Sequence, residues 1–160
     1  SNVLCTLTDY KKDREQDAAL LSLLKEMYGR VYFWPQGGGD LEYIQSLGME
    51  GINLVSPTLH ALTDLLDADV ELDYVGTRLH GGIFSMNHGR RSIILSIDNR
   101  AREMGKDLNL VTVPREDQEQ LRDRLQSSFR TNVTLPKEDI MGWREQFRQS
   151  LHEEVTFHRV

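Results

Sequence analysis

Short apolar runs alternate with helical hydrophobic patterns along most of this chain. The apolar runs are rich in β-branched and aromatic residues, which is typical of strands. We expect strands at residues 3–8, 30–34, 51–55, 74–76, 92–97 and 110–113. The run at 92–97 is apolar enough to be buried on both faces of a sheet.

Between these runs, apolar residues recur at helical spacing, and cap residues mark the ends of the helices. Asp13 is a good N-cap for the first helix, which Gly29 ends, and Gly48 ends the second. Helices are expected from Asp13, at about 40–47, after the Ser56-Pro57 turn, from Arg78, and at about 99–108, 116–129 and 137–152. This alternation predicts βαβ units.

Repeated βαβ units favour an α/β fold with a doubly wound, mostly parallel, Rossmann-like sheet and helices on both faces. The length of 160 residues predicts one domain over 1–160, with helices in its C-terminal part, 114–160. The chain begins directly in a strand, so we expect it to be part of a longer protein.

In such a sheet the loops after the strands meet at one edge, where helix N-termini point into a shared crevice. Polar residues follow most of the predicted strands. They are Asp9, Gln36, Asp40, Ser56, Thr77, Arg78, His80, Asp98 and Arg100. We expect these side chains to share one rim.

The segment Arg78-Leu79-His80 follows a predicted strand and opens a glycine-rich helix. A guanidinium and an imidazole at a helix N-terminus add to the N–H groups and the dipole that already favour an anion there. Arg78 can hold a carboxylate or phosphate through two parallel hydrogen bonds. The structural alternatives are an Arg78 paired with a carboxylate such as Asp73 and a His80 bonded to the backbone.

Other polar signals are weaker. Asp98 and Arg100 either complete an anion cage or form a helix N-cap and a solvated arginine. The run Gly37-Gly38-Gly39 is expected in a loop, and it lacks the Walker lysine and the dinucleotide glycine pattern. No metal site is expected, because the remaining histidines lack metal-ligand spacing. They include His60, predicted on a helix face, and His152 and His158 in the polar terminal region.

Composition excludes some classes of function. The chain has 19 Lys and Arg against 25 Asp and Glu, for a net charge of -6, and no basic run interleaves with aromatics, which disfavours nucleic-acid binding. No stretch approaches the roughly 20 apolar residues of a membrane span, and no signal-peptide pattern opens the chain. We therefore expect a cytoplasmic protein, with the single Cys5 buried and unreactive and Trp34 in the core.

The run Tyr74-Val75-Gly76-Thr77-Arg78-Leu79-His80-Gly81-Gly82, followed by His88-Gly89 and an apolar strand up to Asp98, resembles the C-terminal half of the polysaccharide pyruvyl transferase family. The similarity spans about residues 3–110. Members of this family transfer a pyruvyl group from phosphoenolpyruvate to a sugar of a cell-surface polysaccharide as a ketal. Their two Rossmann-like halves face a cleft, as in GT-B glycosyltransferases.

The resemblance implies phosphoenolpyruvate as donor, a saccharide as acceptor, no separate cofactor, and an N-terminal domain outside this chain. It puts the family's Arg-Leu-His motif on Arg78, Leu79 and His80, with Arg78 holding the anionic groups of the donor and His80 beside the reacting carbons. We expect the rest of the donor site to consist of Thr77, Gln36, Asp98 and Arg100.

One departure from the family lies before the strand at 92–97, where Arg90 and Arg91 follow Gly89 and many relatives have a proline. We expect this change to be conformational, with the charged pair solvated just before the strand; alternatively the pair extends the anion site.

Two other functions compete with pyruvyl transfer. One is the donor half of a GT-B glycosyltransferase that uses a nucleotide sugar, for which Tyr74 is the obvious candidate to hold the base or ribose. The other is a non-catalytic α/β binding module whose last helices dock onto a partner. The docking residues would be Leu125, Phe129, Trp143, Phe147 and Leu151.

Overall fold

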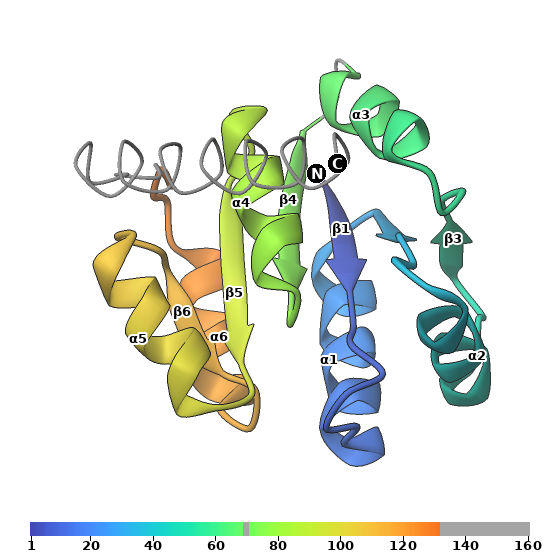
Figure 1. The fold of residues 1–160 in the computed structure, drawn as a ribbon, viewed down its shortest axis with the longest axis horizontal. Coiled ribbons are helices and arrows are strands. Elements are labelled where there is room, and N and C mark those ends of the chain that lie inside the picture. Colours follow the sequence, from blue (N-terminus) through green and yellow to red (C-terminus); the bar gives the residue numbers. More distant parts are fainter. Residues whose placement is uncertain (69–70, 132–160) are drawn as a thin grey trace, which may run out of the picture.

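The computed structural model describes residues 1–68 and 71–131, in which strands and helices alternate along the sequence (Figure 1). The strands are β1 (Asn2–Thr6), β2 (Arg30–Phe33), β3 (Ile52–Leu54), β4 (Leu72–Gly76), β5 (Ser92–Ser96) and β6 (Thr112–Pro114). The helices are α1 (Arg14–Met27), α2 (Gly38–Leu47), α3 (Leu59–Asp67), α4 (Leu79–Asn87), α5 (Asn99–Asp107) and α6 (Gln118–Gln126).

The six strands form one sheet in the order β3-β2-β1-β4-β5-β6, and every neighbouring pair is parallel. The chain first runs outward from β1 to β3 and then returns to the other side of β1 with β4. This confirms the predicted Rossmann-like doubly wound sheet. The reversal between β1 and β4 is a topological switch point, the place where ligands commonly bind in sheets of this kind.

Each face of the sheet carries its own hydrophobic cluster. On one face, Val3 and Cys5 of β1 pack with leucines of α1 and α6 and with Tyr43 and Ile44 of α2. The other face packs Leu4 against leucines of α3 and against α4, with α5 beside it (Figure 1). Successive residues of β1 point to opposite faces of the sheet, and both faces are covered by helices. This is why the strand is apolar throughout.

Several element boundaries differ from those expected. Helix α2 already begins at Gly38, so Gly38 and Gly39 belong to its first turn and the prediction of a glycine loop is wrong for them. Helix α6 spans only Gln118–Gln126 because Asp117 caps it, accepting a hydrogen bond from the Gln120 N–H. The helix expected at 137–152, with Trp143, Phe147, Leu151 and His152, and also His158, lies outside the described residues.

Two buried polar groups lie on the α1 face of the sheet. Cys5 is fully buried, as predicted, and burial raises the pKa of its thiol. Asp17 of α1 is 1% exposed and accepts a hydrogen bond from the Tyr43 hydroxyl at 2.5 Å. Burial raises the pKa of the Asp17 carboxyl, because removing its charge from water destabilises the ionised form. The hydrogen bond from Tyr43 and the nearby charge of Arg115 stabilise that form, but by less.

Trp34 and His60 lie away from the centre of the molecule. Trp34 is partly exposed at the margin of the second cluster and donates a hydrogen bond from its indole nitrogen to the Thr58 carbonyl. His60 is an exposed helix-face residue beside Asp64, as predicted. No helix within the described ranges is long and apolar enough to cross a membrane.

Candidate functional site

The first turn of α4 is held tightly against the sheet at the switch point. Tyr74 of β4 is fully buried, and its hydroxyl donates to the Arg78 carbonyl at 2.6 Å and lies 2.5 Å from the Thr6 hydroxyl. A side chain at Gly82 would overlap Ile94 on β5, so this glycine is what lets α4 lie so close. The hydrogen bond from the buried Tyr74 hydroxyl therefore fixes the backbone of Arg78 just after β4.

The Arg78 side chain is held by a buried carboxylate from another loop. Asp40, in the first turn of α2, is 1% exposed. Its Oδ1 accepts hydrogen bonds from Arg78 Nη2 at 2.5 Å and from the Asp9 N–H at 3.2 Å, and its Oδ2 accepts from the Gln36 N–H at 3.0 Å. One carboxylate thus joins the loops that follow β1, β2 and β4.

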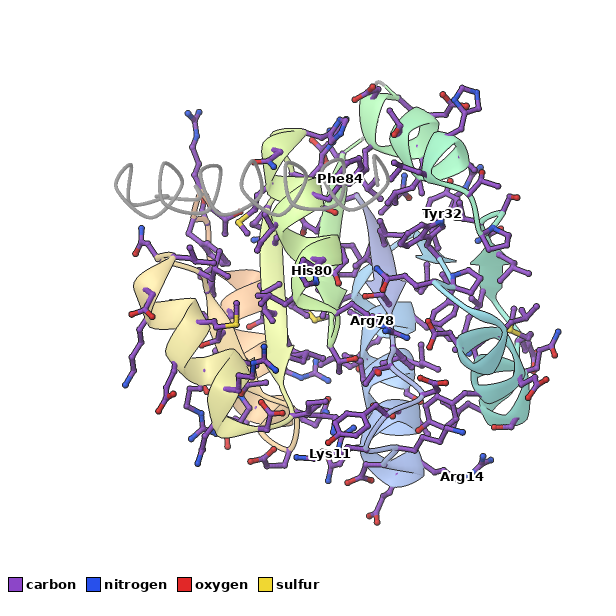
Figure 2. All side chains as sticks on the ribbon, viewed as in Figure 1. Lys11, Arg14, Tyr32, Arg78, His80 and Phe84 are labelled. Carbon is purple, nitrogen blue, oxygen red and sulfur yellow. The ribbon has the colours of Figure 1, made fainter. Side chains whose placement is uncertain are left out.

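A second carboxylate lies beside the same guanidinium. Asp9 Oδ1 is 3.7 Å from Arg78 Nη2, and the Asp9 side chain is 48% exposed. Arg78 itself is 27% exposed and lies beside the carboxyl end of β1 (Figure 2). Its Nε is buried and has no hydrogen-bond partner among the described residues. Arg78 is therefore paired, but it keeps a surface open to solvent.

His80 lies on the same first turn of α4 and faces outward (Figure 2). The side chain is exposed, and within residues 1–68 and 71–131 it makes no hydrogen bond or ion pair. The structural alternative, a histidine bonded to the backbone, is therefore not what this turn contains. An exposed imidazole next to a fixed arginine is available to a ligand.

Three of the predicted donor-site residues contribute to the local structure around Arg78, and of these only Gln36 exposes its side chain. The Thr77 side chain is buried, and its hydroxyl accepts the Thr8 N–H at 3.0 Å, which ties the end of β4 to the end of β1. Leu79 packs against the second hydrophobic cluster. Gln36 contributes its backbone N–H to Asp40, with its side chain exposed.

Asp98 and Arg100 lie at the same edge of the sheet, but no hydrogen bond or ion pair joins either of them to Arg78. Asp98 caps α5 by accepting the Ala101 N–H at 3.0 Å, and its other oxygen is 3.9 Å from Lys11 Nζ. Arg100 is exposed and has no partner in the described part of the chain. The N-cap interpretation is therefore confirmed, and the anion-cage interpretation is not.

The two arginines before β5 are structural. Arg90 donates from Nε to the Leu66 carbonyl at 2.8 Å. Arg91 pairs with Asp73 and lies 5.1 Å from the Phe129 ring. Both residues precede β5 and so lie at the amino end of the strands, opposite Arg78. The predictions of solvated arginines or an extended anion site were wrong, and Asp73 is the partner of Arg91 rather than of Arg78.

Sequence reasoning placed Asp9 and Asp40 on the rim but assigned neither a role. The available signal was their position: each follows a central strand, and their carboxylates are the ones that can reach the loop after β4. In the described residues, no group of three or more His, Cys, Asp or Glu side chains could hold a metal ion.

Comparisons of this chain with protein-family models, curated protein sequences and solved structures gave no match. The resemblance to the polysaccharide pyruvyl transferases stays a prediction from the sequence. The geometry of the site is the structural evidence that bears on function.

The arrangement of Arg78 and His80 suits an anionic ligand that also exchanges a proton. The guanidinium offers charge-assisted hydrogen bonds in a fixed orientation. The first N–H groups of α4 have no partner within the helix, and such groups point out of the helix N-terminus. An exposed imidazole is a side chain that can act as a general acid or base.

Proposed function

We propose that this chain is the donor-binding domain of a polysaccharide pyruvyl transferase, which moves a pyruvyl group from phosphoenolpyruvate to a sugar of a cell-surface polysaccharide as a ketal. One observation carries the proposal: at the switch point of the sheet, Arg78 is fixed by the buried Asp40, and two residues later His80 is exposed and has no partner in the described part of the chain. An anion-binding and a proton-transferring group thus stand on one helical turn.

Phosphoenolpyruvate matches these groups chemically. It carries a carboxylate and a phosphate close together, so that one anionic group can face the Arg78 guanidinium and the other the N–H groups at the start of α4. Thr77, Leu79 and Gln36 then act through the backbone and the packing that position the arginine. No additional cofactor is needed for the transfer.

The proposed reaction begins with protonation of the methylene carbon of phosphoenolpyruvate, for which His80 is the donor. The neighbouring carbon becomes electrophilic, and a sugar hydroxyl adds to it and loses its proton. The carbon–oxygen bond to phosphate then breaks, and a second hydroxyl of the same sugar completes the ketal. Arg78 stabilises the negative charge on the departing phosphate.

This chemistry needs a site closed to water. We propose that the second domain implied by the sequence resemblance closes over the carboxyl edge of the sheet and contributes the groups that hold the acceptor sugar. The proposal places the protein in the cytoplasm, where phosphoenolpyruvate is made.

The two competing functions lose support. Tyr74, the candidate to hold a nucleotide base, is fully buried beneath α4 and cannot stack on a ligand. Leu125 is buried and Phe129 packs against the first hydrophobic cluster, so the domain itself covers these two residues of the suggested docking face. The other three residues of that face lie outside the described part of the chain.

A thermal-shift titration with phosphoenolpyruvate, inorganic phosphate and a uridine diphosphate sugar tests the proposal. We expect the largest rise in melting temperature with phosphoenolpyruvate, and its loss in Arg78→Ala. Arg124→Ala is the matched control, because Arg124 is an exposed arginine in the last turn of α6 whose side chain has no hydrogen bond or ion pair in the described part of the chain. A larger rise with the uridine diphosphate sugar, or an equal response in Arg78→Ala, would contradict pyruvyl transfer.

A further inference from the structure

The two carboxylates beside Arg78 are held in very different ways. Asp40 is buried, and its oxygens accept three hydrogen bonds. The Asp9 carboxylate is half exposed, accepts no hydrogen bond from the described residues, and lies 3.7 Å from Arg78 Nη2, beyond hydrogen-bond distance. Among the described residues, the Asp9 carboxylate is therefore paired with Arg78 by electrostatic attraction and not by a hydrogen bond.

The backbone and the side chain of Asp9 are also decoupled. The Asp9 N–H is bonded to Asp40, so the loop after β1 stays in place whatever the Asp9 side chain does. The Asp9 carboxylate lies against the first turn of α2 where Gly39 has no side chain, since a Cβ at Gly39 would overlap it. The carboxylate can therefore rotate into solvent without moving the loop.

We propose that Asp9 is an internal counter-ion that occupies the place of the ligand's anionic group beside Arg78, and that a bound carboxylate or phosphate displaces it. The inference rests on the proposed role of Arg78 as an anion-binding residue. The ligand's anionic group then lies on the exposed side of the guanidinium, between Arg78 and the first turn of α2. Asp40 stays bonded to Arg78 on the buried side.

A displaced counter-ion lowers the affinity for anions, because the ligand must break one ion pair to form another and must approach a negative charge to do so. The Asp9 pair is exposed, so its effect on affinity is modest, roughly two- to fivefold, which is the range of a solvent-exposed ion pair. Salt should weaken this effect because screening acts on exposed charges.

The test is isothermal titration with two probes, inorganic phosphate and phosphoenolpyruvate, on the full chain. We expect Asp9→Asn to bind both more tightly than the wild type by roughly two- to fivefold, and the gain to shrink at high salt. Asp107→Asn is the matched control: it removes the same charge from an exposed residue at the end of α5 and should leave affinity unchanged. In an Arg78→Ala background, Asp9→Asn should have no effect.

Several results would overturn the inference. Unchanged or weaker binding in Asp9→Asn would mean that Asp9 does not compete with the ligand or that it contacts the ligand favourably. An equal gain in affinity in Asp107→Asn would mean that only the net charge of the protein matters. A gain in affinity that persists in the Arg78→Ala background would mean that Asp9 does not act through Arg78. Failure of both probes to bind Asp9→Asn would also refute it.

The inference and the proposed function fail in different ways. If phosphate binds and responds to Asp9→Asn as expected, but phosphoenolpyruvate has no advantage over phosphate, the counter-ion role stands and pyruvyl transfer does not. If phosphoenolpyruvate is preferred and depends on Arg78, but Asp9→Asn gains nothing, the proposed function stands without the counter-ion.

Discussion

Replacing Asp40 with alanine should destabilise the fold far more than the loss of a surface charge does. The substitution removes the acceptor of three hydrogen bonds. The backbone N–H groups of Asp9 and Gln36 lose their acceptor, and the Arg78 guanidinium loses its buried partner. Breaking a buried pair by removing one partner costs about 3–5 kcal/mol. The N–H groups of Asp9 and Gln36 belong to exposed residues, so water can replace their lost acceptor and they add little to this cost.

These contributions are not additive, and water can reach part of the site. Arg78 is 27% exposed, so after the substitution it can turn to solvent and recover some of its hydration. We therefore expect a loss of about 3–4 kcal/mol in the free energy of unfolding, at the lower end of the range for a buried pair. The loss should not spread to the hydrophobic clusters.

Urea unfolding followed by far-ultraviolet circular dichroism measures this loss as a shift in the midpoint at an unchanged slope. Asp64→Ala is the matched control, because Asp64 is an exposed helical aspartate whose partner, His60, is also exposed; it should change the free energy of unfolding by less than about 0.5 kcal/mol. A loss below about 1 kcal/mol in Asp40→Ala would refute the view that this carboxylate holds three loops.

Three further predictions concern other parts of the molecule. His80→Ala should leave the free energy of unfolding within about 0.5 kcal/mol of the wild type while abolishing the proposed pyruvyl transfer; a large loss of stability would make His80 structural. Because burial raises the pKa of Asp17, the folded state keeps that proton to higher pH, so the free energy of unfolding should fall as pH rises above the ordinary aspartate pKa. Urea titrations across pH should show that Asp17→Asn removes this decline, and an unchanged slope would contradict it. Gly76→Ala should lower the free energy of unfolding by more than about 2 kcal/mol, because its Cβ would lie 2.6 Å from the Thr6 carbonyl oxygen. The control Gly38→Ala should not destabilise the fold, because a Cβ there meets open space. Equal urea midpoints for the two variants would refute this prediction.

The fold could be predicted from the sequence because its signals are local. Most strands are short apolar runs, and most helices carry their own side-chain cap, such as Asp13 at α1 and Asp98 at α5. The right-handed crossovers of βαβ units then decide which face of the sheet each helix covers. The boundary of α2 was missed because glycines read as a loop, although in the structure Asp40 bonds back to the Gln36 N–H at the start of that helix.

The site could be predicted only as a set of residues at one edge. Which side chains pair depends on distances across the sheet: Arg78 bonds to Asp40, 38 positions away, and not to the nearby Asp73. Strand direction explains the error, because Asp73 lies near the amino end of β4 and Arg78 follows its carboxyl end. The same reasoning, applied to Arg90 and Arg91, would have put them at the opposite edge from the site.

Asp40 can act on Arg78 in two ways, and they predict opposite effects on ligand binding. If Asp40 mainly neutralised the guanidinium, Asp40→Asn would bind phosphate more tightly, as we expect of Asp9→Asn. If Asp40 mainly positions it, the variant would bind more weakly, because ordering a free arginine on binding costs about 0.5–1.5 kcal/mol. The buried location and the shared bonds to two loops favour positioning, so we expect the affinity to fall from Asp9→Asn through the wild type to Asp40→Asn, with Arg78→Ala weakest. Phosphate titrations on these chains measure the order, and an Asp40→Asn variant that binds more tightly than the wild type would show that charge, rather than orientation, governs this site.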